Sequence, residues 1–269
     1  MHLLERLSIS LRHVPLLGNA NWLWNIVRPR YDSVIGWLGR RGIERNINGS
    51  DRLLLLPKFR SVTEEYEPDV WALIMSEVEP SDVVADVGVY IGLYTVALAK
   101  RIGTGGRVYA FEPNPVNCEA IKAHLALNSI DERVELVEAA LGERDEKLPF
   151  AVNRGITGHI CQSQTDDTQM LPCLRLDTFI GARRIDILKV DVEGYEEAVL
   201  RGAVKLLCDP ARKPRAIFIE VHPYAWPELG VSSDSLLTLL TDCSYHVTDI
   251  HGSPISQIES YGEIVARPR

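Results

Sequence analysis

The chain has 269 residues, a formal net charge of −8 at pH 7 and an isoelectric point near 5.4. An acidic balance argues against nucleic-acid binding, which needs a basic face. The length predicts one large domain with an N-terminal extension. Because no apolar stretch reaches the length of a membrane span and the N-terminus lacks a secretion-signal pattern, we expect a cytoplasmic protein without a membrane span.

The cysteines argue for a reducing compartment. They stand at positions 118, 161, 173, 208 and 243, and none of them forms a C-x-x-C pair. An odd number without metal-type spacing favours buried thiols over a disulfide or zinc framework.

The N-terminal region predicts a helical extension. Residues 1–47 contain two helical patterns, around 2–12 and 20–40. We therefore expect an extension over residues 1–60, followed by a main domain over residues 61–269.

The second of these helices carries an apolar stripe that includes Trp24, Tyr31 and Ile35, and Pro29 inside it predicts a kink. Such a stripe would be an exposed apolar patch if nothing covered it. Packing on the main domain, a homodimer contact, a lid over the substrate and weak contact with a membrane surface are the alternatives.

The beginning of the main domain is acidic. A short strand is predicted over residues 53–56, and a helix opens at Glu67-Pro68 and ends before Pro80. Because this acidic segment precedes the first strand of the central sheet, we expect Glu67 at the mouth of a cofactor site.

The most informative stretch runs from residue 83 to residue 112 and reads as strand, glycine turn, helix and second strand. Gly88 and Gly92 let the backbone bend sharply and approach a ligand without a Cβ atom in the way. The following helix points its free N–H groups at whatever lies over the turn. Glu112 ends the second strand, where a carboxylate can accept the hydroxyl protons of a ribose. The stretch predicts one βαβ half of a nucleotide-binding fold and a ligand with an adenosine-like ribose.

Two kinds of ligand compete for this turn. A nicotinamide or flavin site normally carries G-x-G-x-x-G, because a pyrophosphate needs close backbone approach. This chain has G-x-x-x-G, preceded by Asp86. S-adenosylmethionine has no phosphate and carries a sulfonium, so an acid and a looser turn suit it better. A purely structural glycine turn is the third interpretation, since lone glycine motifs are weak.

The segment after Glu112 predicts a helix from Pro113-Asn114 to about residue 128, and then a strand over 134–139. The end of that strand, residues 138–141, is expected to pass beside the adenine. The next predicted elements are a strand, a loop and a strand that runs into a short helix, over residues 147–152, 154–159 and 174–179.

Two later strands end in ionisable groups. One emerges at Asp191, ahead of Glu193, and the next ends at His222. Ligands in open α/β sheets bind at the carboxyl ends of strands. We predict that His222, or Asp191 acting alone, serves as a general base at this edge, while Glu193 helps shape the pocket. Lys189 lies inside the first strand and needs a charge partner, for which Asp191 and Asp86 are the candidates.

The same edge offers a second chemistry. Asp191, Glu193, Glu220 and His222 supply carboxylate and imidazole groups, which suit several divalent metals. A general base and a metal ion are therefore alternatives, and we assign no metal site from the sequence.

The tail predicts a helix over residues 233–240, a strand over 245–249 and a final strand near 263–266. These elements complete a mostly parallel, seven-stranded sheet with one antiparallel strand. The predicted fold class is α/β, doubly wound and Rossmann-like.

Over about residues 64–250 the chain resembles the FkbM-type S-adenosylmethionine-dependent methyltransferases. The segments that carry the resemblance are YEPDV at 66–70, DVG-x-x-IGLYT at 86–95, AFEPNP at 110–115, ALG at 140–142, L-x-LDT at 174–178, DILKVDVEG-x-E at 186–196, LRGA at 200–203 and IEVH at 219–222. The family's usual turn reads G-A-N-I-G, whereas this chain has Val89-Tyr90 in place of Ala-Asn. A tyrosine thus replaces an asparagine that could hydrogen-bond the cofactor.

The resemblance implies a class I methyltransferase fold and O-methylation of a hydroxyl on a small molecule, such as a sugar, a glycolipid or a secondary metabolite. A nicotinamide-dependent oxidoreductase and a cofactor-binding scaffold without catalysis are the alternatives. Acceptor selection is expected to reside in residues 1–60 and 153–172. The predicted catalytic residues are Asp191, His222 and Glu193. The predicted S-adenosylmethionine-binding residues are Glu67, Asp86, Gly88, Tyr90, Gly92, Thr95, Glu112, Pro113, Asn114, Ala139, Ala140 and Asp191.

Overall fold

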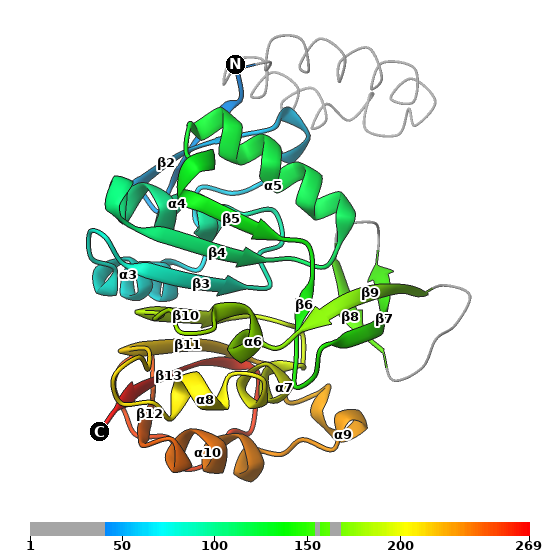
Figure 1. Cartoon of the computed structure of the whole chain (residues 1–269). Coiled ribbons are helices and arrows are strands. Elements are labelled where there is room, and N and C mark those ends of the chain that lie inside the picture. The colour runs from blue at the N-terminus through cyan, green and yellow to red at the C-terminus, as the bar shows by residue number, and fades with distance from the viewer. Residues whose placement is uncertain (1–40, 154–156, 162–167) are drawn as a thin grey trace, which may run out of the picture. The chain divides into compact units, whose positions relative to one another are not determined.

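The computed structural model describes residues 41–153, 157–161 and 168–269 (Figure 1). The predicted helices over 2–12 and 20–40 lie outside the described residues. Residues 44–54 and 63–269 form one compact unit, and the described residues 41–43 and 55–62 belong to a second. The central sheet and the candidate site lie within the first unit.

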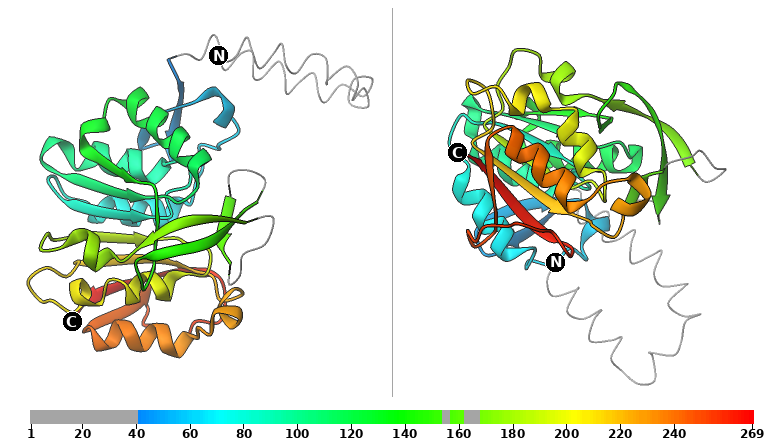
Figure 2. Two further views of the ribbon diagram at one scale, coloured as in Figure 1. Left: turned by 45° about the vertical axis from the view of Figure 1, so that its right-hand side comes forward. Right: turned by 90° about the horizontal axis from the view of Figure 1, so that it is seen from below.

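The centre of the larger unit is a seven-stranded sheet in the order β12-β13-β11-β10-β3-β4-β5 (Figures 1 and 2). Its strands are β3 Val83–Val87, β4 Arg107–Phe111, β5 Val134–Val137, β10 Ile187–Val190, β11 Ala216–Val221, β12 Tyr245–Asp249 and β13 Gly262–Pro268. Strand β13 runs antiparallel to β11 and β12, and the other pairs are parallel. The predicted sheet, with its single antiparallel strand, is confirmed.

Helices pack on both faces of this sheet (Figure 2). The helices are α3 Pro68–Glu77, α4 Leu93–Arg101, α5 Pro115–Asn128, α6 Leu176–Ile180, α7 Glu196–Arg201, α8 Val204–Leu207, α9 Trp226–Leu229 and α10 Ser233–Asp242. Short 3₁₀ helices span Pro57–Phe59, Gly103–Gly105 and Asp131–Arg133.

The two faces follow from the strand period of two. Val87, Val190 and Ile219 belong to the core cluster that also contains residues of α6, α7, α8 and α10. Asp86 and Lys189, each one residue away, point to the opposite face, where Asp86 bonds Thr95 of α4. Alternation along the strands therefore places Asp86 and Lys189, a charged pair from two adjacent strands, on one face of the sheet. The apolar layer lies on the other face.

Local signals explain the helix starts. Pro115 occupies the first turn of α5, and the Asn114 side chain caps it by accepting a bond from the Val116 N–H at 3.0 Å. At α10, Ser232 and Ser235 form a reciprocal capping box.

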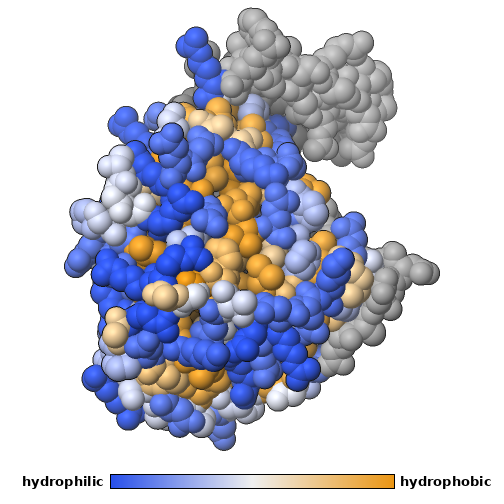
Figure 3. Space-filling model, in the orientation of Figure 1, coloured by the Kyte–Doolittle hydropathy of each residue, from blue (hydrophilic) through white to orange (hydrophobic). Residues whose placement is uncertain are grey.

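On the face seen in Figure 3 the surface is mostly hydrophilic, with hydrophobic residues exposed at its middle.

A second, four-stranded sheet in the order β6-β9-β7-β8 follows β5 in the chain. Its strands are β6 Ala140–Leu141, β7 Glu146–Asn153, β8 Thr157–Ile160 and β9 Thr168–Leu174. The predicted strand over 147–152 is confirmed as part of β7. The predicted loop over 154–159 is wrong for residues 157–159, which form β8, and the predicted strand at 174–179 ends at Leu174, where α6 follows.

Near the start of the described chain, β1 Ile43–Ile47 and β2 Asp51–Leu55 form a two-stranded sheet. Strand β1 was not expected. Asn48 and Gly49 connect the strands with φ of 50° and 73°, which is the left-handed pair that a tight hairpin turn needs. The Asn48-Gly49 dipeptide is the sequence signal for this hairpin.

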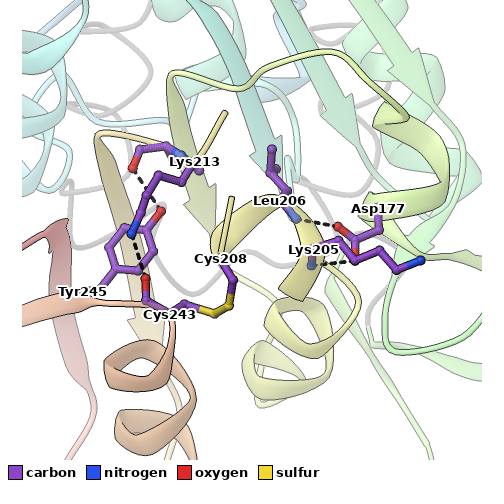
Figure 4. The surroundings of a disulfide bond; sticks show 8 residues. Asp177, Lys205, Leu206, Cys208, Lys213, Cys243 and Tyr245 are labelled. Carbon is purple, nitrogen blue, oxygen red and sulfur yellow. Dashed lines mark hydrogen bonds between the residues drawn. A yellow bond between two sulfur atoms is a disulfide. The ribbon is translucent and has the colours of Figure 1, made fainter. Parts of the chain in front are cut away.

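The cysteine prediction is wrong at one pair, because Cys208 and Cys243 form a disulfide (Figure 4). Each residue caps the C-terminus of a helix, α8 and α10 respectively. Lys213 donates to the Cys243 carbonyl at 2.7 Å, and its ammonium lies 4.7 Å from the ring centroid of Tyr245. The two cysteines are 35 residues apart, so only the packing of the two helices brings them together. Closing a loop of this length stabilises a fold by about 3–4 kcal/mol.

Candidate functional site

A cavity of about 280 Å³ opens at the carboxyl ends of β3, β4, β10 and β11. Its most marked property is charge. The carboxylates that line it are Glu67, Glu112, Asp191, Glu193 and Glu220. Among the described residues no Lys, Arg or His side chain lines it. The cavity therefore favours a cationic ligand over an anionic one.

The turn after β3 forms one wall of the cavity. Gly88 and Gly92 have φ of 84° and 86°, a left-handed conformation that glycine adopts at little cost. A Cβ atom on Gly88 would lie 1.6 Å from the carbonyl oxygen of Asp191. The two strand ends thus meet at a contact that only glycine permits.

Tyr90, in the same turn, has a left-handed φ of 55°. Asparagine tolerates this region better than tyrosine, which gives a backbone reason for the asparagine in the family's usual G-A-N-I-G turn. The Tyr90 side chain lines the cavity, and its N–H donates to Glu112.

Glu112 is fixed at the end of β4 by three donors. Its carboxylate accepts bonds from the N–H groups of Tyr90 and Asn114, at 2.8 and 2.9 Å, and from the Asn117 amide at 3.2 Å. Only 4% of the residue is exposed. Burial raises the pKa of Glu112 to about 7, against the opposing effect of these hydrogen bonds. The carboxylate is preorganised as an acceptor at the cavity wall.

A buried lysine, Lys189, lies behind the cavity, and its partner Asp191 lines the cavity. Lys189 Nζ is 3.1 Å from Asp191 Oδ2, so the predicted Lys189–Asp191 pairing is confirmed. Burial lowers the pKa of Lys189, but the charges of Asp191 and Asp86 outweigh it and raise that pKa above its ordinary value. Burial raises the pKa of Asp86, because it disfavours the charged carboxylate. Oδ2 of Asp86 accepts a hydrogen bond from Thr95 Oγ1 at 2.6 Å.

The two residues that precede α3, Tyr66 and Glu67, line the cavity. Glu67, at φ of 41°, lines the cavity and accepts a bond from the Tyr94 hydroxyl at 2.8 Å. Tyr66 packs edge-on against Trp71 and Tyr94, with ring centroids 6.2 Å from each. These contacts hold Glu67 at the cavity, and its expected role toward a cofactor stays a prediction.

Four acids and a histidine come together at the ends of β10 and β11. They are Asp191, Glu193, Glu196, Glu220 and His222. Nδ1 of His222 lies 2.7 Å from Oε1 of Glu196, which is fully buried. Nε2 of His222 lies 3.7 Å from Glu193 and 3.8 Å from Glu220. Burial lowers the pKa of His222, but the bond to Glu196 and the neighbouring carboxylates outweigh it and raise that pKa above its ordinary value.

The predicted site residues fall into two layers. Those that line the cavity are Glu67, Gly88, Tyr90, Glu112, Pro113, Ala140, Asp191 and Glu193. Those that do not are Asp86, Gly92, Thr95, Asn114, Ala139 and His222. The second group supports the first from behind, through the bond of Thr95 to Asp86, the cap at Asn114 and the position of His222 against Glu193.

Several residues of the cavity wall were not predicted from the sequence. Phe150 of β7 and Ile160 of β8 line the cavity, and both belong to the second sheet, whose position no local pattern revealed. Asn117 also lines it and bonds Glu112. One turn of helix separates it from the strand end, and that spacing was the signal available. Glu196 is the last residue of the DILKVDVEG-x-E segment, but that segment indicates no role for it, and its contact with His222 is what identifies one.

The fold and the site together define a class of protein. A seven-stranded sheet with one antiparallel strand, and a cavity over a glycine turn with an acid at the end of the next strand, is the arrangement of class I methyltransferases. Residues 86–247 match the family model of the methyltransferase FkbM domain. The chain belongs to the FkbM methyltransferase family.

The similar proteins include three named methyltransferases. The hexuronic acid methyltransferase AglP of Haloferax volcanii is 28% identical over 186 residues, which cover 65% of this chain and 68% of AglP. Methyltransferase 1 of Beauveria bassiana is 26% identical over 44% of this chain and 57% of its own. Methyltransferase sdnD of Sordaria araneosa is 26% identical over 44% of this chain and 59% of its own. The match thus spans less than two thirds of the two fungal proteins.

Among solved structures, the FkbM methyltransferase from Methylobacillus flagellatus aligns with a TM-score of 0.46 and 18% identity, over 72% of this chain and 49% of its own. A SAM-dependent O-methyltransferase from Thermotoga maritima aligns with a TM-score of 0.45 and 14% identity, over 78% of this chain and 69% of its own. In the described part of the chain no helix is long and apolar enough to cross a membrane.

Proposed function

We propose that this methyltransferase uses S-adenosylmethionine to methylate a hydroxyl oxygen of a small molecule. The observation that carries the proposal is the five-carboxylate lining of the cavity, in which no described basic side chain takes part. A nicotinamide dinucleotide would bring its pyrophosphate into that field and be repelled. S-adenosylmethionine brings a sulfonium and an ammonium, which the same field attracts.

The residues present suit this cofactor. Glu112 is buried, fixed and acceptor-only when ionised, so it would accept hydrogen bonds from both hydroxyls of the ribose. The turn at Gly88 and the carboxylate of Glu67 would bound the amino acid end. Asp86 lies one layer behind and supports the turn through Thr95 and Lys189. The bound cofactor supplies an electrophilic methyl group, and the chain's part is to hold an acceptor oxygen in line with it.

The acceptor class rests on the relatives and on the strand ends. AglP is named for a hexuronic acid, which is a sugar derivative. In this chain Asp191, Glu193 and Glu220 face the cavity and can accept bonds from several hydroxyl groups at once. A polyhydroxylated acceptor of the sugar type is the class that such an edge fits best.

Calorimetry with two ligands tests the cofactor. S-adenosylhomocysteine is expected to bind the full chain, and NAD is expected to give no heat of binding, because only the second carries a pyrophosphate. Glu112→Ala should weaken the binding of S-adenosylhomocysteine, and its circular dichroism spectrum should show that the fold is intact. Binding of NAD alone would refute the proposal and favour an oxidoreductase.

Cofactor affinity should depend on pH through Glu112. With a pKa of about 7 in the free protein, Glu112 is half protonated at that pH. Ribose hydroxyls donate to the ionised form, so affinity rises with pH and levels off above the pKa. When the pH falls from 8 to 6, the Kd of S-adenosylhomocysteine is expected to rise about tenfold. Glu112→Gln is the control, and a wild-type profile as flat as that of the variant would contradict the assignment.

The predicted base assignment stays a proposal. Asp191 lines the cavity and His222 does not, which supports Asp191 as the group that acts on the acceptor hydroxyl, with His222 acting through Glu193 or Glu220. Asp191→Asn is expected to lower turnover about 10²–10⁴-fold with cofactor affinity largely kept. Turnover with a sugar acceptor and S-adenosylhomocysteine calorimetry on Asp191→Asn and His222→Ala measure the two effects. If both variants keep more than about a tenth of wild-type turnover, positioning alone accounts for catalysis.

A further inference from the structure

Three side chains at the carboxyl edge of the sheet converge on one point. Asp191 follows β10, Glu220 lies near the end of β11, and His222 follows β11. Each offers one ligand atom, and these atoms all lie within 4.8 Å of one another. Asp191 and Glu220 face the cavity, while His222 closes the group from behind.

The buried histidine is oriented in the way that a metal-binding imidazole is oriented. Its side chain is 3% exposed, and Nδ1 is held by Glu196 at 2.7 Å. Glu196 is itself fixed by the Gly194 N–H at 2.7 Å and by the Trp226 indole N–H at 2.8 Å. Among the described residues Nε2 makes no hydrogen bond, and it points at the carboxylates of Glu193 and Glu220. A carboxylate that holds one ring nitrogen and directs the other into a cluster of ligands is the usual support of a metal-bound histidine.

The charge around this point is unbalanced. Asp191, Glu193 and Glu220 meet there, and Glu263 stands beside Glu220 in the β11–β13 register. The nearby lysine, Lys189, is already paired with Asp191. These carboxylates carry like charges and repel one another. A cation at the point of convergence would relieve this repulsion.

We propose that Asp191, Glu220 and His222 bind one divalent first-row metal ion, Mn²⁺ or Zn²⁺ in preference to Mg²⁺ or Ca²⁺. An imidazole ligand favours the first pair, and oxygen-only sites favour the second. Ligands about 2.1 Å from an ion lie at most about 4.2 Å apart. The present separation of up to 4.8 Å closes with small side-chain rotations.

The ion would leave coordination positions open toward the cavity for oxygens of the acceptor. A metal there lowers the pKa of a bound hydroxyl and orients it. Asp191 would then act on the acceptor as a ligand of the ion, and the proton that the hydroxyl loses on methylation would pass to solvent water instead of to Asp191. This consequence rests on the proposed methyl transfer, whereas binding of the ion does not, so the experiment measures binding.

The test uses the full chain, freed of metal with EDTA and titrated with Mn²⁺ while free Mn²⁺ is followed by electron paramagnetic resonance. One ion per chain is expected, with competition by Zn²⁺. Glu220→Gln and His222→Ala are each expected to weaken Mn²⁺ at least about tenfold. Glu263→Gln removes the same charge from the neighbouring strand position without removing a ligand, and it should change the affinity little.

Two results would overturn the site. One is wild-type protein that binds no Mn²⁺ or Zn²⁺ while it still binds S-adenosylhomocysteine, which would leave the proposed function standing. The other is a Glu263→Gln variant as weak as Glu220→Gln, which would show diffuse attraction to an acidic edge. Circular dichroism of each variant separates lost ligands from lost folding, and Glu220→Gln suffices if His222→Ala does not fold.

Discussion

Gly88→Ala is expected to be the most damaging small substitution in the described chain. The new Cβ atom would lie 1.6 Å from the carbonyl oxygen of Asp191 and 2.7 Å from its carbonyl carbon. Neither backbone segment can yield without separating the ends of β3 and β10. We expect a loss of more than about 4 kcal/mol in the free energy of unfolding, together with loss of S-adenosylhomocysteine binding. Urea unfolding and calorimetry measure the two effects.

Gly103→Ala is the matched control. Gly103 has a comparable left-handed φ of 68°, but a Cβ atom there would meet no atom within 4 Å. It should therefore cost only the backbone strain, about 1 kcal/mol. Equal losses in the two variants would mean that strain, and not the contact of the two strand ends, explains the effect at Gly88.

Lys189→Met should also cost much of the stability. The lysine is 6% exposed. It lies opposite Asp86 of the adjacent strand β3 and pairs with Asp191, which follows its own strand β10. Methionine fills a similar volume but leaves two carboxylates without their cation. Removing one partner of a buried ion pair costs about 3–5 kcal/mol, which urea unfolding would detect. The cause is the stranded charge, not a lost contact.

A double variant isolates that cause. Lys189→Met combined with Asp86→Asn removes a negative charge together with the positive one, and it should recover a large part of the lost stability. Lys122→Met removes an exposed lysine paired with Glu119 and Glu138 and should leave the free energy of unfolding nearly unchanged. A double variant no more stable than Lys189→Met would show that packing of the lysine stem, and not charge, is what matters.

Much of the fold was readable in advance because its signals are contiguous. The valines of β3, the glycines at 88 and 92 and the acid at 112 lie within one 30-residue βαβ unit, and each acts on the backbone next to it. The strand ends at Asp191 and His222 were found in the same way. Alternation along β10 even placed Lys189 on the side of Asp191, since strand period alone decides which face a side chain takes.

Tertiary structure decided what depends on segments far apart in the chain. The Cys208–Cys243 disulfide joins two helix ends, and Glu196 becomes the support of His222 only once α7 packs beside the end of β11. Sequence placed His222 at the cavity edge, but the fold buries it behind Glu193 and Glu220. Residue types and periods determine which groups an edge of the sheet offers. Their distances, and so whether they act as base, ligand or support, follow from packing that no local pattern encodes.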